Sequence, residues 1–178
     1  MAADNPFDGV RFPEEELEVA VYDIAFELTH RTCNSAQASL ACLQQVFGKQ
    51  DQALVQASFA FEGGLAFTTK GTCGALTGCS LFMGQLLGEG SLKERDPTTG
   101  SLCEEMVLTL AERFVEEYGS IRCEDIQATL FGCSFNLQSK SGFEEFRSAG
   151  APQRCPDLVG KACLWTVYIL KQGRDRSA

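Results

Sequence analysis

Apolar residues recur at three- and four-residue spacing along nearly all of this 178-residue chain, and glycine or proline marks the ends of most runs. The clearest run extends from Ser101 to Tyr118 and places Met106, Leu110 and Phe114 on one face. Such spacing predicts amphipathic helices. The segment 129–137 is compatible with a short strand, but no second segment is predicted to pair with it. We therefore expect an all-α fold, a single-domain bundle of about six to seven helices.

Capping and breaking residues give the approximate helix boundaries. We expect an N-terminal extension over residues 1–12, a helical domain over 13–171 and a flexible tail over 172–178. Within the domain, helices are expected from Pro13, from Asn34 or Ser35 to Gly48, over 52–61, over 73–87, over 101–118, from Cys123 and over 156–171, with a loop at 89–100 and a helical turn near 142–147.

Three of the nine cysteines occupy similar positions in this pattern. Cys73, Cys123 and Cys155 each follow turn-forming residues and precede a helical run. The unpaired N–H groups and the positive dipole end of a helix start stabilise a thiolate. Arg122 and Arg154 add positive charge beside two of these thiols, whereas the acidic residues that follow oppose it. The direction of the net pKa shift stays open, but the placement indicates chemistry rather than packing.

The remaining cysteines have other interpretations. Cys42, Cys79, Cys103 and Cys163 lie within apolar helical runs, where cysteine behaves as a small hydrophobic residue. Cys133 lies in a loop, and its role is left open. The odd total means that at least one thiol of a monomer is unpaired.

Several function classes are excluded by composition and by missing motifs. The net charge of −9 argues against nucleic acid as a partner. There is no Cys-x-x-Cys, no c-type haem attachment motif, no P-loop and no Gly-x-Ser-x-Gly. His30 is the only histidine, which argues against Cys–His catalysis and a multi-His metal site. The absence of a secretory signal or a membrane-length apolar run predicts a cytoplasmic protein with no membrane span.

The glycines have two interpretations. Gly63, Gly64 and Gly71 can shape a loop whose N–H groups approach a cofactor, a sulfur or an anion. Gly78, Gly84 and Gly88 are instead expected to allow close helix packing. For Gly74, directly after Cys73, both interpretations stay open.

The motifs around these cysteines resemble those of a known family. The run Gly71-Thr72-Cys73-Gly74-Ala75-Leu76-Thr77-Gly78, followed by Cys123 and Cys155, is similar to the pattern of the C_GCAxxG_C_C family of redox-active proteins. The segment Asn34-Ser35-Ala36-Gln37-Ala38 resembles the family's first motif, Asn-Cys-Ala-Gln-Ala, with Ser35 in place of its cysteine. The resemblance covers about residues 30–170. It implies an all-helical fold and a redox role for four cysteines, and a related region of split-Soret cytochromes accompanies an iron–sulfur cluster.

We therefore expect a redox-active protein that performs electron transfer or thiol–disulfide exchange. Cys73, Cys123 and Cys155 are the expected catalytic residues or metal ligands, with Cys33 as the fourth ligand, and Gly71 and Gly74 as cofactor-binding residues. An iron–sulfur cluster is one option for the cofactor, zinc is a weaker one, and c-type haem is excluded. The expected partner is a redox protein, with a homo-oligomer left open. The alternative is a helical binding or scaffold domain that keeps the fold and has lost the chemistry.

Overall fold

The computed structural model describes residues 5–88 and 101–177, apart from the side chains of residues 17–19. Within these residues the chain is all-helical, with eight α-helices, one short 3-10 helix and no strand. The elements are α1 (Glu15–Thr32), α2 (Ser35–Phe47), α3 (Gln52–Ala57), η1 (Ser58–Phe61), α4 (Gly74–Leu87), α5 (Leu102–Tyr118), α6 (Cys123–Phe131), α7 (Lys140–Ser148) and α8 (Ala151–Ser177). The loop expected at 89–100 lies outside the described residues.

Most helix ends coincide with the capping residues seen in the sequence. Asn34 caps α2 by accepting a hydrogen bond from the Gln37 N–H, and Gly48 ends the same helix in the left-handed conformation. Ser101 and Glu104 form a reciprocal capping box at the start of α5. These local signals explain why the all-α prediction is confirmed.

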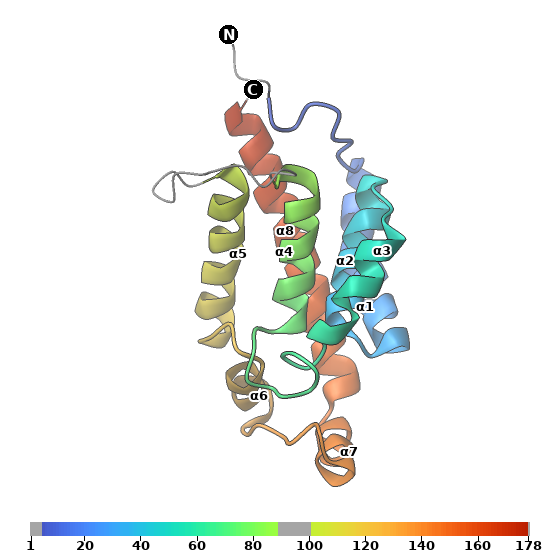
Figure 1. Cartoon of the computed structure of the whole chain (residues 1–178), viewed down its shortest axis with the longest axis vertical. Helices are drawn as coiled ribbons and strands as arrows, with labels where there is room; N and C mark the ends of the chain where they lie inside the picture. Colours follow the sequence, from blue (N-terminus) through green and yellow to red (C-terminus); the bar gives the residue numbers. More distant parts are fainter. Residues whose placement is uncertain (1–4, 89–100, 178) are drawn as a thin grey trace.

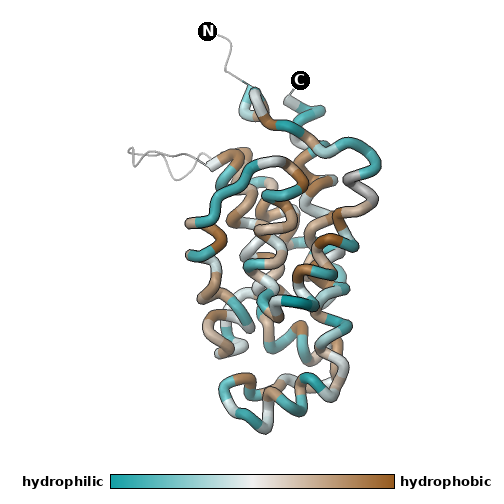
Figure 2. Tube along the Cα trace, turned by 90° about the vertical axis from the view of Figure 1, so that its right-hand side faces the viewer, coloured by the Kyte–Doolittle hydropathy of each residue, from teal (hydrophilic) through white to brown (hydrophobic). Residues whose placement is uncertain are grey.

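The long helices pack side by side, with α8 contacting α1, α2, α4 and α5 (Figure 1). Hydrophobic and hydrophilic residues alternate along the helices, as amphipathic packing requires (Figure 2). Phe47, Phe82, Phe114 and Leu170 are among the fully buried core side chains. None of the described helices combines the length and the apolar character needed to span a membrane.

The described residues form eight α-helices where six to seven were predicted, and α7 accounts for part of this difference. It forms nine residues of helix where only a turn was expected. The segment 129–137, which was compatible with a short strand, forms none, because α6 continues to Phe131 and a loop follows.

The last helix is longer at both ends than predicted. It begins at Ala151 rather than at Pro156, and it continues to Ser177 where a flexible tail was expected. Pro156 has no N–H, so it cannot donate to the Pro152 carbonyl one turn earlier. His30 Nδ1 lies 3.1 Å from that carbonyl oxygen, within the distance at which an Nδ1–H tautomer donates a hydrogen bond. The lone histidine therefore supports the proline-containing turn of α8.

Both ends of α8 are held by other segments. At the C-terminal end, Asn5 donates a side-chain hydrogen bond to the Ser177 carbonyl, and the Arg174 guanidinium lies 4.4 Å from the centre of the Phe12 ring. At the opposite end, α6 and α7 lie beyond the ends of the long helices (Figure 1). We call residues 123–148 the cap.

The cap has a small aromatic core of its own. The rings of Phe131, Phe135 and Phe146 contact one another with centroids 5.4 to 5.8 Å apart, and Phe143 adjoins Phe146. Aromatic contacts of this kind hold the two short helices together. The cap therefore presents a fixed apolar surface to the end of the bundle.

Candidate functional site

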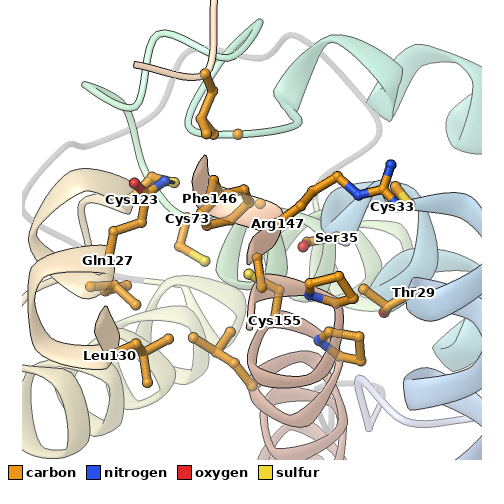
Figure 3. A pocket seen from close by; sticks show the side chains of 18 of the residues that line it. Thr29, Cys33, Ser35, Cys73, Cys123, Gln127, Leu130, Phe146, Arg147 and Cys155 are labelled. Carbon is orange, nitrogen blue, oxygen red and sulfur yellow. Dashed lines mark hydrogen bonds between the residues drawn. The ribbon is translucent and has the colours of Figure 1, made fainter. Parts of the chain in front are cut away.

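A cavity of about 230 Å³ lies between the cap and the end of the bundle. All four cysteines that the sequence singled out line it, together with Ser35 (Figure 3). They come from separate elements: Cys33 follows α1, Cys73 precedes α4, Cys123 begins α6 and Cys155 lies within α8. The fold thus gathers residues that are up to 122 positions apart in the sequence.

A short backbone ladder brings Cys73 and Cys123 together. The Cys73 N–H donates to the Ile121 carbonyl at 2.8 Å, and the Cys123 N–H donates to the Gly71 carbonyl at 3.0 Å. These bonds flank an isolated antiparallel bridge between Thr72 and Arg122. Two helix starts from different parts of the chain are therefore held side by side by main-chain hydrogen bonds.

The loop before this ladder has an unusual backbone. Gly63 and Gly64 are followed by three residues that also have positive φ angles, Leu65, Ala66 and Phe67. Left-handed conformations cost non-glycine residues about 1 kcal/mol or more each. A Cβ atom on Gly64 would lie 2.7 Å from the Cβ atom of Cys123. Glycine at this position therefore allows the loop to lie directly against the site.

Cys155 and Cys33 occupy different positions from those predicted. Because α8 begins at Ala151, Cys155 lies in its second turn rather than at its start. Cys33 ends α1 in the left-handed conformation, with φ of 56°, and its side chain is exposed at the cavity rim. Ser35 is the first residue of α2 and lies beside Gly74 at the start of α4.

Burial, rather than the helix starts, decides the pKa values of the three inner thiols. Loss of solvation is the largest cause and raises the pKa of Cys73, of Cys123 and of Cys155, the last to about 12. Charge on Cys123 raises the pKa of Cys73 and of Cys155 further. The N–H groups at the start of α4 oppose the shift at Cys73 but do not reverse it.

Arg122 and Arg154 precede Cys123 and Cys155 in the sequence, but their guanidinium groups interact with other groups. Arg122 pairs with Glu124 and lies near Asp125. Arg154 donates to the Leu130 carbonyl and lies over the Phe131 ring. Their charges are therefore directed to the surface and to the cap.

Gln127 is a site residue that the sequence interpretation missed. Its side chain is buried, its Nε2 donates to the Cys123 sulfur at 3.4 Å, and its Oε1 accepts from the Phe135 N–H at 2.9 Å. The hydrogen bond lowers the pKa of Cys123, against the larger effect of burial. A glutamine one helical turn after Cys123 was the available signal, since residues four apart share a helix face.

Comparison with protein families supports the motif interpretation. The family model described as Putative redox-active protein (C_GCAxxG_C_C) matches residues 33–169. The chain belongs to this family. Comparison with curated proteins found no match, and comparison with solved structures found none.

The departure from the C_GCAxxG_C_C pattern at Ser35 is visible in the site. Ser35 lines the cavity alongside Cys73 and Cys155, so the hydroxyl occupies the region where the family's first cysteine is expected. Cys33 also lines the cavity, but from its exposed rim. The cavity therefore has three inner thiols, a serine where the family pattern has its first cysteine, and one further thiol at the exposed rim.

The two glycines predicted to bind a cofactor differ in position. Gly74 lines the cavity, and a Cβ there would lie 3.1 Å from the Ala36 nitrogen and 3.3 Å from the Ser35 Cβ. Gly71 is absent from the cavity wall, and its backbone instead accepts from Cys123 and donates to Gly64. Gly74 thus permits close approach of α2 and α4, whereas Gly71 belongs to the ladder.

All nine cysteines are free thiols. Cys42, Cys79 and Cys163 are fully buried in the bundle core, as predicted, while Cys133 is exposed. In the described part of the chain, no group of three or more His, Cys, Asp or Glu side chains is arranged to hold one metal ion. The donor set therefore does not fit a single zinc ion.

Proposed function

We propose that this C_GCAxxG_C_C protein is a thiol-based redox protein whose centre is formed by Cys73, Cys123 and Cys155. The observation that carries the proposal is the convergence of these three thiols, each from a different helix, on one cavity. Convergence of this kind is not required for packing, because the buried core cysteines Cys42, Cys79 and Cys163 do not line this cavity.

The proposed reaction is exchange with a disulfide of a partner molecule. Two of the three thiols form one S–S bond, the partner's S–S bond breaks, and the two thiol protons are transferred to the two partner sulfurs. Two electrons leave the protein, so atoms and charge balance. Cys33 lies at the exposed rim, where a partner disulfide can reach it first. Its thiolate would form a mixed disulfide with the partner, and one of the inner thiols would then attack that disulfide.

The test is equilibration of the reduced protein with oxidised and reduced glutathione, followed by alkylation and peptide mapping. We expect one disulfide to form between two of Cys73, Cys123 and Cys155. The buried core cysteines Cys42 and Cys163 provide an internal control, because they are at least as buried as the site thiols but do not line the cavity.

Each outcome of this test is informative. A disulfide within the cavity set supports the proposal, and replacing either of its two cysteines by Ser should abolish it. If all three thiols remain free while exposed Cys33 or Cys133 exchanges, the redox proposal fails. That result would favour the alternative of a helical binding domain that has lost the chemistry.

An iron–sulfur cluster is the second candidate, and one observation favours it. The first residues of four helices, α2, α4, α6 and α8, all line the cavity. Helix starts stabilise negative charge, and thiolate-bound clusters are anionic. Cys73, Cys123 and Cys155 would hold the cluster, which would supply one-electron transfer. Because the described residues are not arranged to hold a metal ion, cluster binding would have to rearrange these three thiols. Iron and sulfide content of anaerobically purified protein tests this candidate, and Ser35→Cys should raise both if a fourth thiolate is needed.

A further inference from the structure

Four phenylalanine side chains contribute to the cavity wall. Phe67, Phe131, Phe143 and Phe146 line it, with aliphatic side chains from α6, α8 and the loop between α6 and α7. Its volume of about 230 Å³ exceeds the roughly 150 Å³ of an apolar cavity that accepts a benzene molecule. The cavity is therefore large enough for one aromatic ring and a short substituent.

The charge around the cavity differs from that of the whole protein. The chain carries a net charge of −9, yet no Asp or Glu side chain is among the described residues that line the cavity. Arg147 is exposed on α7 and lines it, and no ion pair involves Arg147 in the described part of the structure. Its side chain extends from the cap toward Cys33 at the rim (Figure 3). The starts of α2, α4, α6 and α8 add positive potential around the cavity.

Apolar walls and a cationic rim together define a ligand class. We propose that the cavity binds a small aromatic carboxylate, with its ring among the phenylalanines and its carboxylate against Arg147. A guanidinium matches a carboxylate in charge and geometry, and the ring replaces water along the aromatic wall. This binding goes beyond the proposed redox function and does not depend on it.

The test is calorimetric titration of the fully reduced protein with 3-phenylpropionate, in the absence of any oxidant. The uncharged 3-phenylpropionamide serves as a matched probe of the same shape. We expect the carboxylate to bind about tenfold more tightly than the amide, as one charge-assisted hydrogen-bonded pair provides. Bound carboxylate should also slow alkylation of Cys155, which places it in the cavity.

Two variants separate a specific site from general charge. Arg147→Gln should weaken carboxylate binding about tenfold and leave amide binding unchanged. Arg113→Gln removes the same charge from an exposed position on α5, outside the cavity, and should change neither. The proposal is overturned if the carboxylate does not bind, if Arg147→Gln has no effect, or if Arg113→Gln weakens binding equally. Every binding measurement uses reduced protein. A negative binding result therefore does not bear on the disulfide proposal, and a negative disulfide result does not bear on carboxylate binding.

Discussion

At the residue scale, two effects on the cavity thiols act in opposite directions. A helix start stabilises an exposed charge by about 0.3–1 kcal/mol. Full burial of an ionisable group shifts its pKa by up to 3–5 units, which is several kcal/mol. The raised pKa values of Cys73, Cys123 and Cys155 show that burial dominates. The resting site therefore holds neutral thiols and needs an oxidant or a cation to release their protons.

This has a direct consequence for thiol labelling. With a pKa of about 12, Cys155 has roughly one part in ten thousand of thiolate at pH 8, against about a quarter for an unperturbed thiol. We expect iodoacetamide to modify exposed Cys33 and Cys133 first and Cys155 on the order of a thousandfold more slowly. Peptide mass spectrometry over time measures the order. In urea-unfolded protein all three should react alike, and rapid labelling of Cys155 in the folded protein would contradict the pKa assignment.

At the element scale, α2 and α4 meet at a glycine. A Cβ on Gly78 would lie 2.0 Å from the Ser39 Oγ and 2.3 Å from the Ala36 carbonyl oxygen. Gly78→Ala should therefore destabilise the protein by about 1–3 kcal/mol through overpacking. Gly84, on the same helix, has nothing within 4 Å of such an atom, so Gly84→Ala should stabilise by up to about 1 kcal/mol. Urea midpoints of both variants measure the difference, and equal effects would show that α2 and α4 are not this close.

The same helix shows what sequence patterns can predict. Four-residue glycine spacing predicted close packing for Gly78, Gly84 and Gly88. This is confirmed only for the first, because Gly84 is exposed and a Cβ on Gly88 would meet only the Gly84 backbone of its own helix. Helix starts with a local cap, such as Asn34, were predictable since their signal lies within four residues.

Features that depend on distant partners were not predictable in this way. The start of α8 was missed because Pro156 normally marks a helix boundary. The Pro152 carbonyl, which Pro156 cannot bond, is instead contacted by His30, 122 residues earlier in the sequence. The left-handed turn that begins at Gly64 lies against Cys123, which is distant in the sequence. For the cavity, all four lining cysteines could be selected from the sequence, whereas Gln127 and the aromatic cap required the structure.

At the scale of the whole molecule, the bundle contains buried ionisable groups at two levels. Cys73, Cys123 and Cys155 lie at the cap end, while Cys163 lies within the core beside Cys42 and Cys79, and its pKa is also raised by burial. Tyr118 adds a buried phenol whose hydroxyl has no hydrogen-bond partner in the described part of the structure. Burial is the first cause of its raised pKa as well. The three cavity thiols, Cys163 and Tyr118 are therefore neutral in the folded protein at neutral pH.

Because the raised pKa values belong to the folded state alone, stability should fall in alkali. Between about pH 9 and pH 12 the unfolded chain has lost protons that the native protein still holds, for example on Cys155. The free energy of unfolding then decreases with pH, by up to about 1.4 kcal/mol per pH unit for each such group. Urea titrations at pH 7, 8, 9 and 10 should show little change at first and a steep loss above pH 9.

Tyr118→Phe isolates one contribution to that loss. It removes a titrating hydroxyl that makes no hydrogen bond in the described structure, so stability at pH 7 should be unchanged or higher by up to about 1 kcal/mol. The loss of stability at pH 10 should also be smaller than in the wild type. Tyr22→Phe is the matched control, because the Tyr22 hydroxyl donates to Asp157 at 2.6 Å and its removal should lower stability at pH 7. If Tyr118→Phe is as costly at neutral pH as Tyr22→Phe, the buried hydroxyl has a hydrogen-bond partner, such as an internal water, and the expected gain on its removal is wrong.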